Sequence, residues 1–238
     1  MHNLHPRRVG LALSGGGVRG LAHIGVIKAL EDLGLQPVVV AGTSAGSLVG
    51  AGLAAGMNWR ELAAMARSVF WPSLFNGRRL EAFCTRHLPA TFGDLCLPFA
   101  AVATEIRSRR VVAITEGPLA SAISASCAVR VVRRAVVRDG RRLKDGGYVC
   151  VMPSVVAREL GAEFVIASDV WELSGLLRGA GCHPLHPLFP AHYRAAVRGT
   201  DLLVQPEIPL ACHAPTKSAI DRLIAAGERA THRALSRL

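Results

Sequence analysis

Two short apolar segments that end in glycine-rich turns constrain the fold most strongly. The segment 9–13 runs into Ser14 and three glycines, and the segment 37–41 runs into a turn over residues 42–46. Each turn is followed by apolar residues at helical spacing, over 21–33 and 48–55. Two successive units of strand, glycine turn and helix predict an α/β architecture with a largely parallel central sheet.

The rest of the chain continues this alternation. Helical patterns cover 59–88 with an interruption at 70–75, then 119–128 and 155–160. Strand patterns cover 99–104, 110–115, 164–168 and 202–205, and the segments 131–137 and 142–144 are strand or connector. The segment 172–191 is rich in Gly, Pro and His, which predicts a long mobile loop.

Length and composition favour one domain. The chain has 238 residues, of which 50% are hydrophobic, enough to bury one sizeable core. We therefore expect a single domain over residues 1–238, with its motifs within about 9–206 and an amphipathic helix over about 218–238. The segment 38–58 is too rich in glycine and hydroxyl residues for a membrane span. With no signal peptide pattern and no paired cysteine motif, we expect a cytoplasmic protein.

The net charge of +11 favours association with a polyanion, either nucleic acid or an anionic lipid surface. Seven basic residues lie between Arg130 and Lys144, against one acid, Asp139. Together with the apolar segment 69–75, this stretch predicts peripheral contact with an anionic membrane. The alternative is that the basic residues form an ordinary solvated face and that the aromatic residues belong to the core.

The second turn fits the pattern Gly-x-Ser-x-Gly, written here as Gly42, Thr43, Ser44, Ala45 and Gly46. It follows a predicted strand and precedes a predicted helix, as a nucleophile elbow requires. The positions two residues from the serine must be nearly free of side chain, because the strand and the helix crowd the turn. Ser44 is therefore the candidate nucleophile.

The first turn is a glycine loop that consists of Gly15, Gly16, Gly17, Val18, Arg19 and Gly20. It also fits the dinucleotide pattern Gly-x-Gly-x-x-Gly, which needs an acid near the end of the second strand to bind the ribose. That strand ends instead in Ala41, Gly42 and Thr43. The loop fits better as an oxyanion hole, in which backbone N–H groups stabilise a developing alkoxide.

A nucleophilic serine needs a base, and the usual base is histidine. The order serine, acid, histidine could be met by Ser44, by Asp145 or Asp169, and by one of three histidines, His183, His186 or His192. These histidines lie in a proline-rich segment without a supporting motif. A Ser-His-Asp esterase therefore remains an alternative.

The stretch Asp145, Gly146 and Gly147 offers a different base. Together with the glycine loop and the elbow, in this order, it resembles the patatin-like phospholipase family. The resemblance includes residues 125–128 and extends more weakly through 201–206 to the final helix. One departure is visible, since Val129 and Arg130 follow at a point where relatives commonly have proline.

The resemblance implies a three-layer α/β/α sandwich and a Ser–Asp dyad, in which Ser44 is acylated and Asp145 accepts its proton. It implies a lipid or phospholipid ester as substrate, neither metal nor other cofactor, and no nucleic acid partner. A protein that has kept the fold as a catalytically silent lipid- or partner-binding module is a further alternative. A nucleotide-binding protein is disfavoured by the missing ribose acid and by the absence of a Gly-Lys-Ser/Thr motif.

Overall fold

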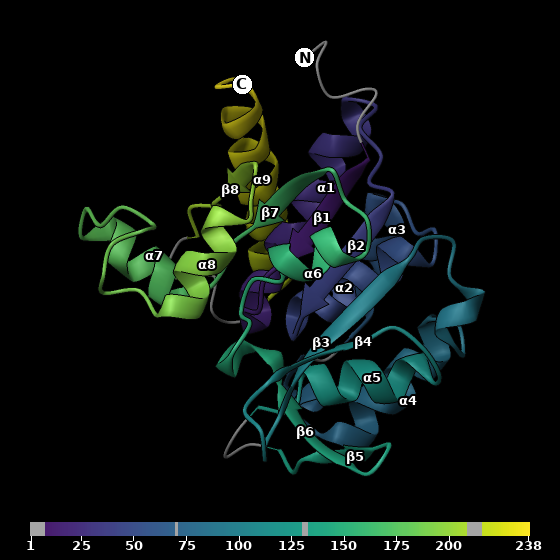
Figure 1. The fold of residues 1–238 in the computed structure, drawn as a ribbon. Coiled ribbons are helices and arrows are strands. Elements are labelled where there is room, and N and C mark those ends of the chain that lie inside the picture. The colour runs from purple at the N-terminus through teal and green to yellow at the C-terminus, as the bar shows by residue number, and fades with distance from the viewer. Residues whose placement is uncertain (1–7, 70, 130–132, 209–215) are drawn as a thin grey trace.

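The computed structural model describes residues 8–69, 71–129, 133–208 and 216–238, and a single eight-stranded sheet lies at its centre (Figure 1). The strands are β1 Val9–Leu13, β2 Val39–Thr43, β3 Phe99–Glu105, β4 Val111–Ile114, β5 Val136–Arg138, β6 Arg141–Asp145, β7 Phe164–Ser168 and β8 Leu202–Val204. The helices are α1 Ala22–Asp32, α2 Ala45–Ala54, α3 Trp59–Ser68, α4 Gly77–His87, α5 Leu119–Ser126, α6 Ser154–Glu159, α7 Glu172–Gly179, α8 Ala191–Arg198 and α9 Lys217–Leu235.

The sheet is mixed and mostly parallel, as the sequence predicts. The parallel part has the order β3-β2-β1-β7-β8, whereas β4 and β6 run antiparallel to β3 and β5 runs antiparallel to β6. Its central strands are buried on both faces, which explains why their sequences are continuously apolar instead of alternating.

Helices cover both faces of the sheet and produce the three layers (Figure 1). One core lies between the sheet and α1, α2 and α9, and contains Leu11, Leu13 and Leu223. The second core lies between the opposite face and α6 and α8, and contains Ala12 and Tyr193. Neighbouring residues of β1 thus enter different cores, as the two-residue repeat of a strand requires.

The register of β3 brings β6 to the end of β2. The first half of β3 pairs with β2, up to Val102 opposite Thr43, and its second half pairs with β6, where Ala103 is opposite Asp145. Because β4 pairs with residues 101–104, it occupies the other edge of β3. The strands β2 and β6 therefore share one edge, and Asp145 follows directly beyond Thr43.

The expectation of a long mobile loop over 172–191 is wrong in its first half, which forms the helix α7. This helix has Glu172 in its first turn and Arg178 in its last turn, both favourable to the helix dipole. Only the remainder, from Ala180 to Pro190, connects α7 to α8 without a helix or strand. The prediction failed because the glycines and prolines after residue 179 dominate the composition of the segment, which hides the short amphipathic pattern of residues 172–179.

Candidate active site

The elbow holds Ser44 in a strained backbone conformation between β2 and α2. Ser44 has φ 53° and ψ −121°, which an L-residue adopts only at a cost, and it precedes the first residue of α2. Its side chain is therefore presented at the end of the strand, beside the unpaired N–H groups of the helix N-terminus.

The two glycines of the elbow are required by space. A Cβ atom at Gly42 would lie 2.4 Å from the carbonyl oxygen of Gly46, and one at Gly46 would lie 2.3 Å from the carbonyl oxygen of Leu13. Thr43 secures the turn from the opposite side, because its Oγ1 donates a hydrogen bond of 2.8 Å to the carbonyl oxygen of Cys150. The turn therefore has little freedom to relax.

Ser126 fixes the backbone of the elbow from α5. Its hydroxyl donates to the carbonyl oxygen of Val102 at 2.6 Å and accepts from the Ser44 N–H at 2.8 Å. A further hydroxyl, that of Ser47, donates to the Ser44 carbonyl oxygen at 2.6 Å. Both polar groups of the Ser44 backbone are thus satisfied, which leaves its side chain as the group available for chemistry.

Asp145 ends β6 and is buried, with 7% of its surface exposed. Its backbone N–H donates to the carbonyl oxygen of Ala128 at 3.1 Å, and its Oδ1 accepts from the Gly147 N–H at 2.8 Å. Oδ2 has no hydrogen-bond partner among the residues that the structure describes. One carboxylate oxygen is therefore held by the backbone, and the other has no donor within hydrogen-bonding geometry in the described parts of the chain.

Burial raises the pKa of Asp145 above the ordinary value of a carboxyl group. The nearby Ser44 hydroxyl, the Gly147 N–H and the charge of Arg133 each act to lower this pKa, but burial outweighs them. A carboxylate with a raised pKa is a better proton acceptor than an exposed one.

Gly146, next to Asp145, lies against the backbone of β3. A Cβ atom at this position would lie 2.3 Å from the carbonyl oxygen of Val102. Only glycine lets the end of β6 approach β3 and β2 this closely. The close packing of Gly146 thus fixes the position of the neighbouring Asp145 carboxylate.

The glycine loop lies beside the elbow at the end of β1. A Cβ atom at Gly15 would be 3.4 Å from the Ser44 Cβ, so the two turns are in contact. The Gly15 N–H donates to the carbonyl oxygen of Val151 at 2.9 Å and is not free for a substrate. Arg19 N–H donates to the Gly16 carbonyl oxygen. In the described parts of the chain, the N–H groups of Gly16, Gly17 and Val18 therefore remain the candidates for oxyanion donors.

His23, which no local sequence motif marks, is fully buried in α1 behind the glycine loop. Its Nε2 lies 2.9 Å from the carbonyl oxygen of Ser14, and its Nδ1 lies 2.8 Å from the Ser168 hydroxyl. A carbonyl oxygen only accepts, so Nε2 carries the proton and Nδ1 accepts from Ser168. His23 therefore ties the ends of β1 and β7 together, and neither nitrogen is free to serve as a base.

Burial lowers the pKa of His23 from 6.5 to about 4. His23 becomes protonated below about pH 6.5 in the unfolded chain, but only below about pH 4 in the folded chain. The free energy of unfolding therefore decreases as the pH falls from 6.5 to 4. The loss amounts to about 3 kcal/mol when complete. We expect urea unfolding to show this loss in the unmodified protein and a smaller one in His23→Gln. An identical pH dependence in the two proteins would contradict the assignment.

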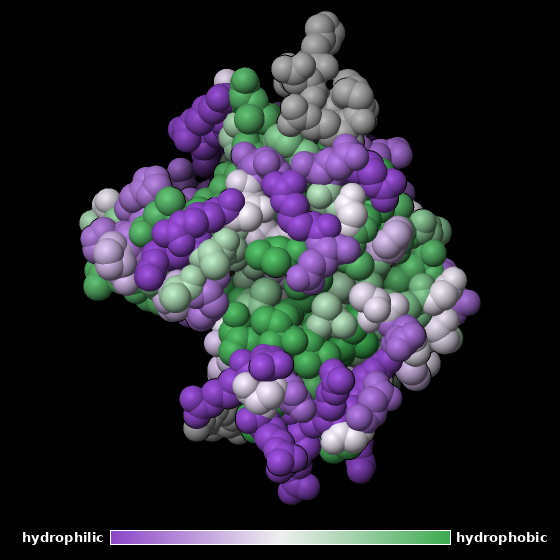
Figure 2. All heavy atoms as spheres, in the orientation of Figure 1, coloured by the Kyte–Doolittle hydropathy of each residue, from purple (hydrophilic) through white to green (hydrophobic). Residues whose placement is uncertain are grey.

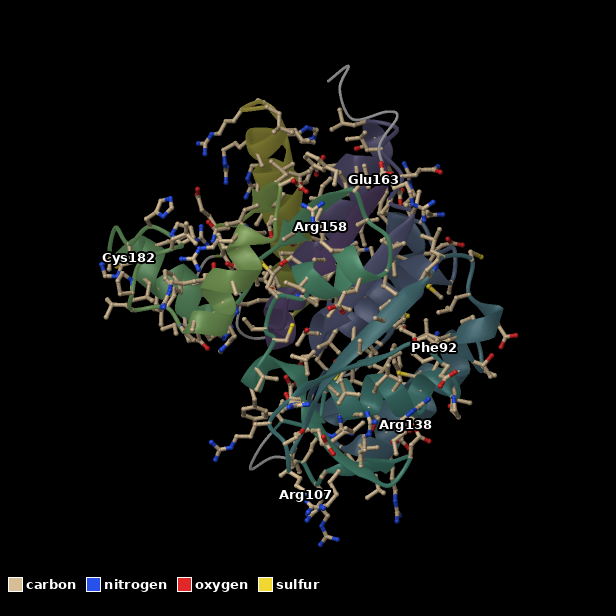
Figure 3. All side chains as sticks on the ribbon, viewed as in Figure 1. Phe92, Arg107, Arg138, Arg158, Glu163 and Cys182 are labelled. Atoms are coloured by element: carbon tan, nitrogen blue, oxygen red, sulfur yellow. The ribbon has the colours of Figure 1, made fainter. Side chains whose placement is uncertain are left out.

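Two of the three histidines considered as alternative bases, His183 and His186, lie on the connection between α7 and α8. His183 Nδ1 and His186 Nδ1 accept hydrogen bonds from the N–H groups of Leu185 and Leu188, within their own connection. Figure 3 shows the neighbouring Cys182 at the outer end of this region. His192 lies on α8, which packs against α6.

Asp169, the alternative acid, belongs to a different buried network. Its Oδ2 accepts from the Tyr193 hydroxyl at 2.7 Å and from Gln205 Nε2 at 2.9 Å, and its Oδ1 accepts from the Trp171 N–H. The carboxylate therefore joins β7, β8 and α8. Its oxygens are already occupied by these donors.

Much of the basic stretch 130–144 is directed inward. Arg133 donates to the Ser124 hydroxyl and to the Cys127 carbonyl oxygen. Arg138 donates to two carbonyl oxygens of the 116–118 turn, and Lys144 to that of Arg133. Arg130 lies outside the described residues. The exposed basic residues of this stretch are Arg134, Arg141 and Arg142.

The apolar segment 69–75 packs in part on the protein. Trp71 and Leu74 are partly buried against the main core, and the Trp71 indole N–H donates to the carbonyl oxygen of Ala66 at 3.0 Å. Phe70 lies outside the described residues. Among the helices that the structure describes, none has the length and apolar character to cross a bilayer.

The sandwich and the serine turn define the class of the protein as an α/β fold with a nucleophile elbow. The chain belongs to the patatin-like phospholipase family, whose profile matches residues 11–157, more than half of its length. The expected family and fold are thus confirmed. Members of this family are generally carboxylic ester hydrolases.

Relatives agree with this membership. The chain is 35% identical over 181 residues to the human patatin-like phospholipase domain-containing protein 6, in a match that covers 68% of this chain and 13% of that protein. It is 37% identical over 174 residues to an NTE family protein of Mycobacterium tuberculosis, in a match covering 67% of this chain and 48% of that protein. The chain therefore corresponds to half or less of the length of these relatives.

Solved structures share the fold at low sequence identity. VipD of Legionella pneumophila superposes with a TM-score of 0.62 and 15% identity, over 98% of this chain and 67% of VipD. The type III effector ExoU superposes with a TM-score of 0.57 and 16% identity, over 98% of this chain and 53% of ExoU.

Proposed function

We propose that the chain is a serine acyl hydrolase that cleaves fatty-acyl esters of lipids through Ser44 and Asp145. The observation that carries this proposal is the strained Ser44 beside a buried carboxylate with one unpartnered oxygen. Family membership supplies the substrate class, a lipid ester. The raised pKa of Asp145 supports its role as the base.

In the proposed reaction, the Ser44 hydroxyl oxygen attacks the ester carbonyl carbon while its proton passes to Asp145 Oδ2. The carbonyl oxygen becomes an oxyanion and accepts hydrogen bonds from the N–H groups of Gly16, Gly17 and Val18. When the tetrahedral intermediate collapses, Asp145 returns the proton to the leaving alcohol and an acyl-enzyme remains. Water, deprotonated by Asp145, then attacks the acyl-enzyme, and Asp145 returns this proton to the Ser44 oxygen as the fatty acid is released.

A panel of lipid esters tests the proposed function, with released fatty acid as the readout and Ser44→Ala as the control. We expect release from at least one glycerolipid by the unmodified protein and none by the variant. No release from any lipid of the panel, or equal release by both proteins, would favour a catalytically silent binding protein.

We further propose that the enzyme contacts anionic membranes through a basic docking surface, defined by Arg107, Arg109, Arg134, Arg141 and Arg142. All five are exposed, on the turn after β3 and around the β5–β6 hairpin. These elements extend from the same sheet edge as Asp145. Hydrophilic residues gather at this lower end of the molecule in Figure 2, and Arg107 projects there in Figure 3.

Changing Arg134, Arg141 and Arg142 together to Gln is expected to weaken binding to vesicles that contain anionic lipid. Each basic residue near such a surface contributes about 1 kcal/mol, so the loss should be roughly a hundredfold at low salt. Co-sedimentation with vesicles measures it. Arg133 and Arg138 are left unchanged, because their inward hydrogen bonds would confound the result.

The control carries the same charge change elsewhere, at the exposed Arg60, Arg198 and Arg222. A general effect of net charge would weaken both triple variants equally, and that outcome would exclude a localised docking surface.

A further inference from the structure

An arginine-lined cavity of about 770 Å³ lies between the glycine loop, α7 and α9. It lies at the β8 end of the sheet, on the side of the molecule away from β5 and β6 (Figure 1). Its charged lining residues are Arg19, Glu172, Arg178, Glu207, Arg229 and Arg233.

The cavity carries an excess of positive charge. Arg19 pairs with Glu172 at 3.4 Å, and Arg233 pairs with Glu207 at 3.2 Å. Both carboxylates are largely exposed, with 61% and 80% of their side-chain surface accessible, so solvent weakens these pairs. Arg178 and Arg229 form no ion pair with a carboxylate among the described residues, so the lining carries two more arginines than carboxylates.

The arginines also retain unsatisfied donors. Arg19 Nε and Arg178 Nε are both buried and have no hydrogen-bond acceptor in the part of the chain that the structure describes. Buried N–H donors normally have acceptors, and an oxyanion can accept several hydrogen bonds at once. The chemistry of the cavity therefore fits a phosphate group.

The cavity is joined to the elbow by direct packing. Gly15 contacts Ser44, and the next residue, Gly16, packs against Val170, so closely that a Cβ atom there would lie 2.7 Å from a Val170 methyl carbon. Val170 itself lines the cavity. Since neighbouring strands are about 4.8 Å apart, the path from β2 across β1 to β7 spans about 10 Å.

We propose that this arginine cavity binds the phosphate group of a phospholipid headgroup while the acyl ester of the same lipid lies at Ser44. The proposal rests on the proposed hydrolase function and adds a headgroup preference to it. Arg178 and Arg229 are its specificity-determining residues, because they are the arginines of the cavity without a carboxylate partner.

The kinetic test compares a lysophospholipid with a monoacylglycerol that has the same acyl chain and lacks the phosphate. Arg178→Gln and Arg229→Gln should each lower kcat/KM for the lysophospholipid about tenfold, mainly through KM, because each removes a charge-assisted hydrogen bond. Hydrolysis of the monoacylglycerol should not change. The control is Arg222→Gln, which removes an exposed arginine of α9 outside the cavity and should affect neither substrate.

An equal loss on both substrates, or an equal loss in the Arg222→Gln control, would overturn the proposal. Calorimetric titration with glycerol 3-phosphate provides a second readout that does not depend on hydrolysis. Binding that disappears in the Arg178→Gln, Arg229→Gln double variant would support the cavity even if no ester is cleaved. Absence of binding to the unmodified protein would overturn it.

Titration with inorganic phosphate distinguishes a headgroup site from a site for the free anion. We expect glycerol 3-phosphate to bind more tightly than inorganic phosphate. Equal affinity, combined with equal kcat/KM for the two lipids, would assign the cavity to free phosphate and contradict the headgroup proposal.

Discussion

Replacing Ser44 with alanine is expected to lower the rate of ester hydrolysis by a factor on the order of 10⁴ or more, because the variant has no oxygen to form the acyl-enzyme. The fold should be unaffected. The hydrogen bonds of Ser44 to Ser126 and Ser47 are made by its backbone, and alanine keeps both. Hydrolysis of a short-chain ester and thermal unfolding measure the two effects on the same sample.

Ser108→Ala is the matched control, since it removes a serine hydroxyl from an exposed turn. Ser44→Gly adds a test of the strain. Glycine adopts φ 53° at little cost, so this variant should unfold at a higher temperature than Ser44→Ala while being equally inactive. A Ser44→Ala protein with more than a few per cent of the activity would require a different nucleophile.

Asp145→Asn should lower kcat by a factor on the order of 10² to 10⁴, the range that general-base catalysis supplies, and should also raise the melting temperature at neutral pH. The second effect follows from the raised pKa of the carboxyl group. A group whose pKa is raised by folding stabilises the native state at pH values below its unfolded pKa and loses this contribution as the pH rises through its folded pKa. At neutral pH the buried charge is therefore a cost, which the neutral amide removes.

The pH dependence of the unmodified enzyme should follow the same carboxyl group. The rate should rise with pH through the raised pKa of Asp145, because the ionised form is the base. His183→Gln, His186→Gln and His192→Gln should retain both the rate and this profile. A loop-histidine variant as inactive as Ser44→Ala would establish a Ser-His-Asp triad instead, and a lower melting temperature of Asp145→Asn would contradict the electrostatic cost.

Local sequence carried most of the information about the elbow and the glycine loop. Each is a continuous stretch in which the adjacent strand and helix leave no room for a side chain, as the contacts of Gly42 and Gly46 illustrate. The family resemblance then indicated Asp145, which lies 101 positions after Ser44 in the sequence. Ser44 and Asp145 are close because β2 and β6 pair with successive halves of the same edge of β3.

The supporting residues depend on long-range packing and had no local signal. Ser126 reaches the Ser44 N–H from α5, and His23 joins Ser14 to Ser168 across two strands. A single buried histidine in an apolar helix gives no indication of its partners. The basic stretch shows the same limit, since Arg133 is directed inward and the adjacent Arg134 is exposed.

Labelling with a fluorophosphonate tests the central claim most directly, because this reagent reacts with a serine only when its hydroxyl is activated. Mass spectrometry of the digested protein locates the adduct. We predict one adduct, on Ser44, which forms rapidly in the unmodified protein and at least a hundredfold more slowly in Asp145→Asn, in keeping with the range of general-base catalysis. An unlabelled protein, an adduct on another serine, or equal labelling rates in the two proteins would contradict a Ser44–Asp145 dyad.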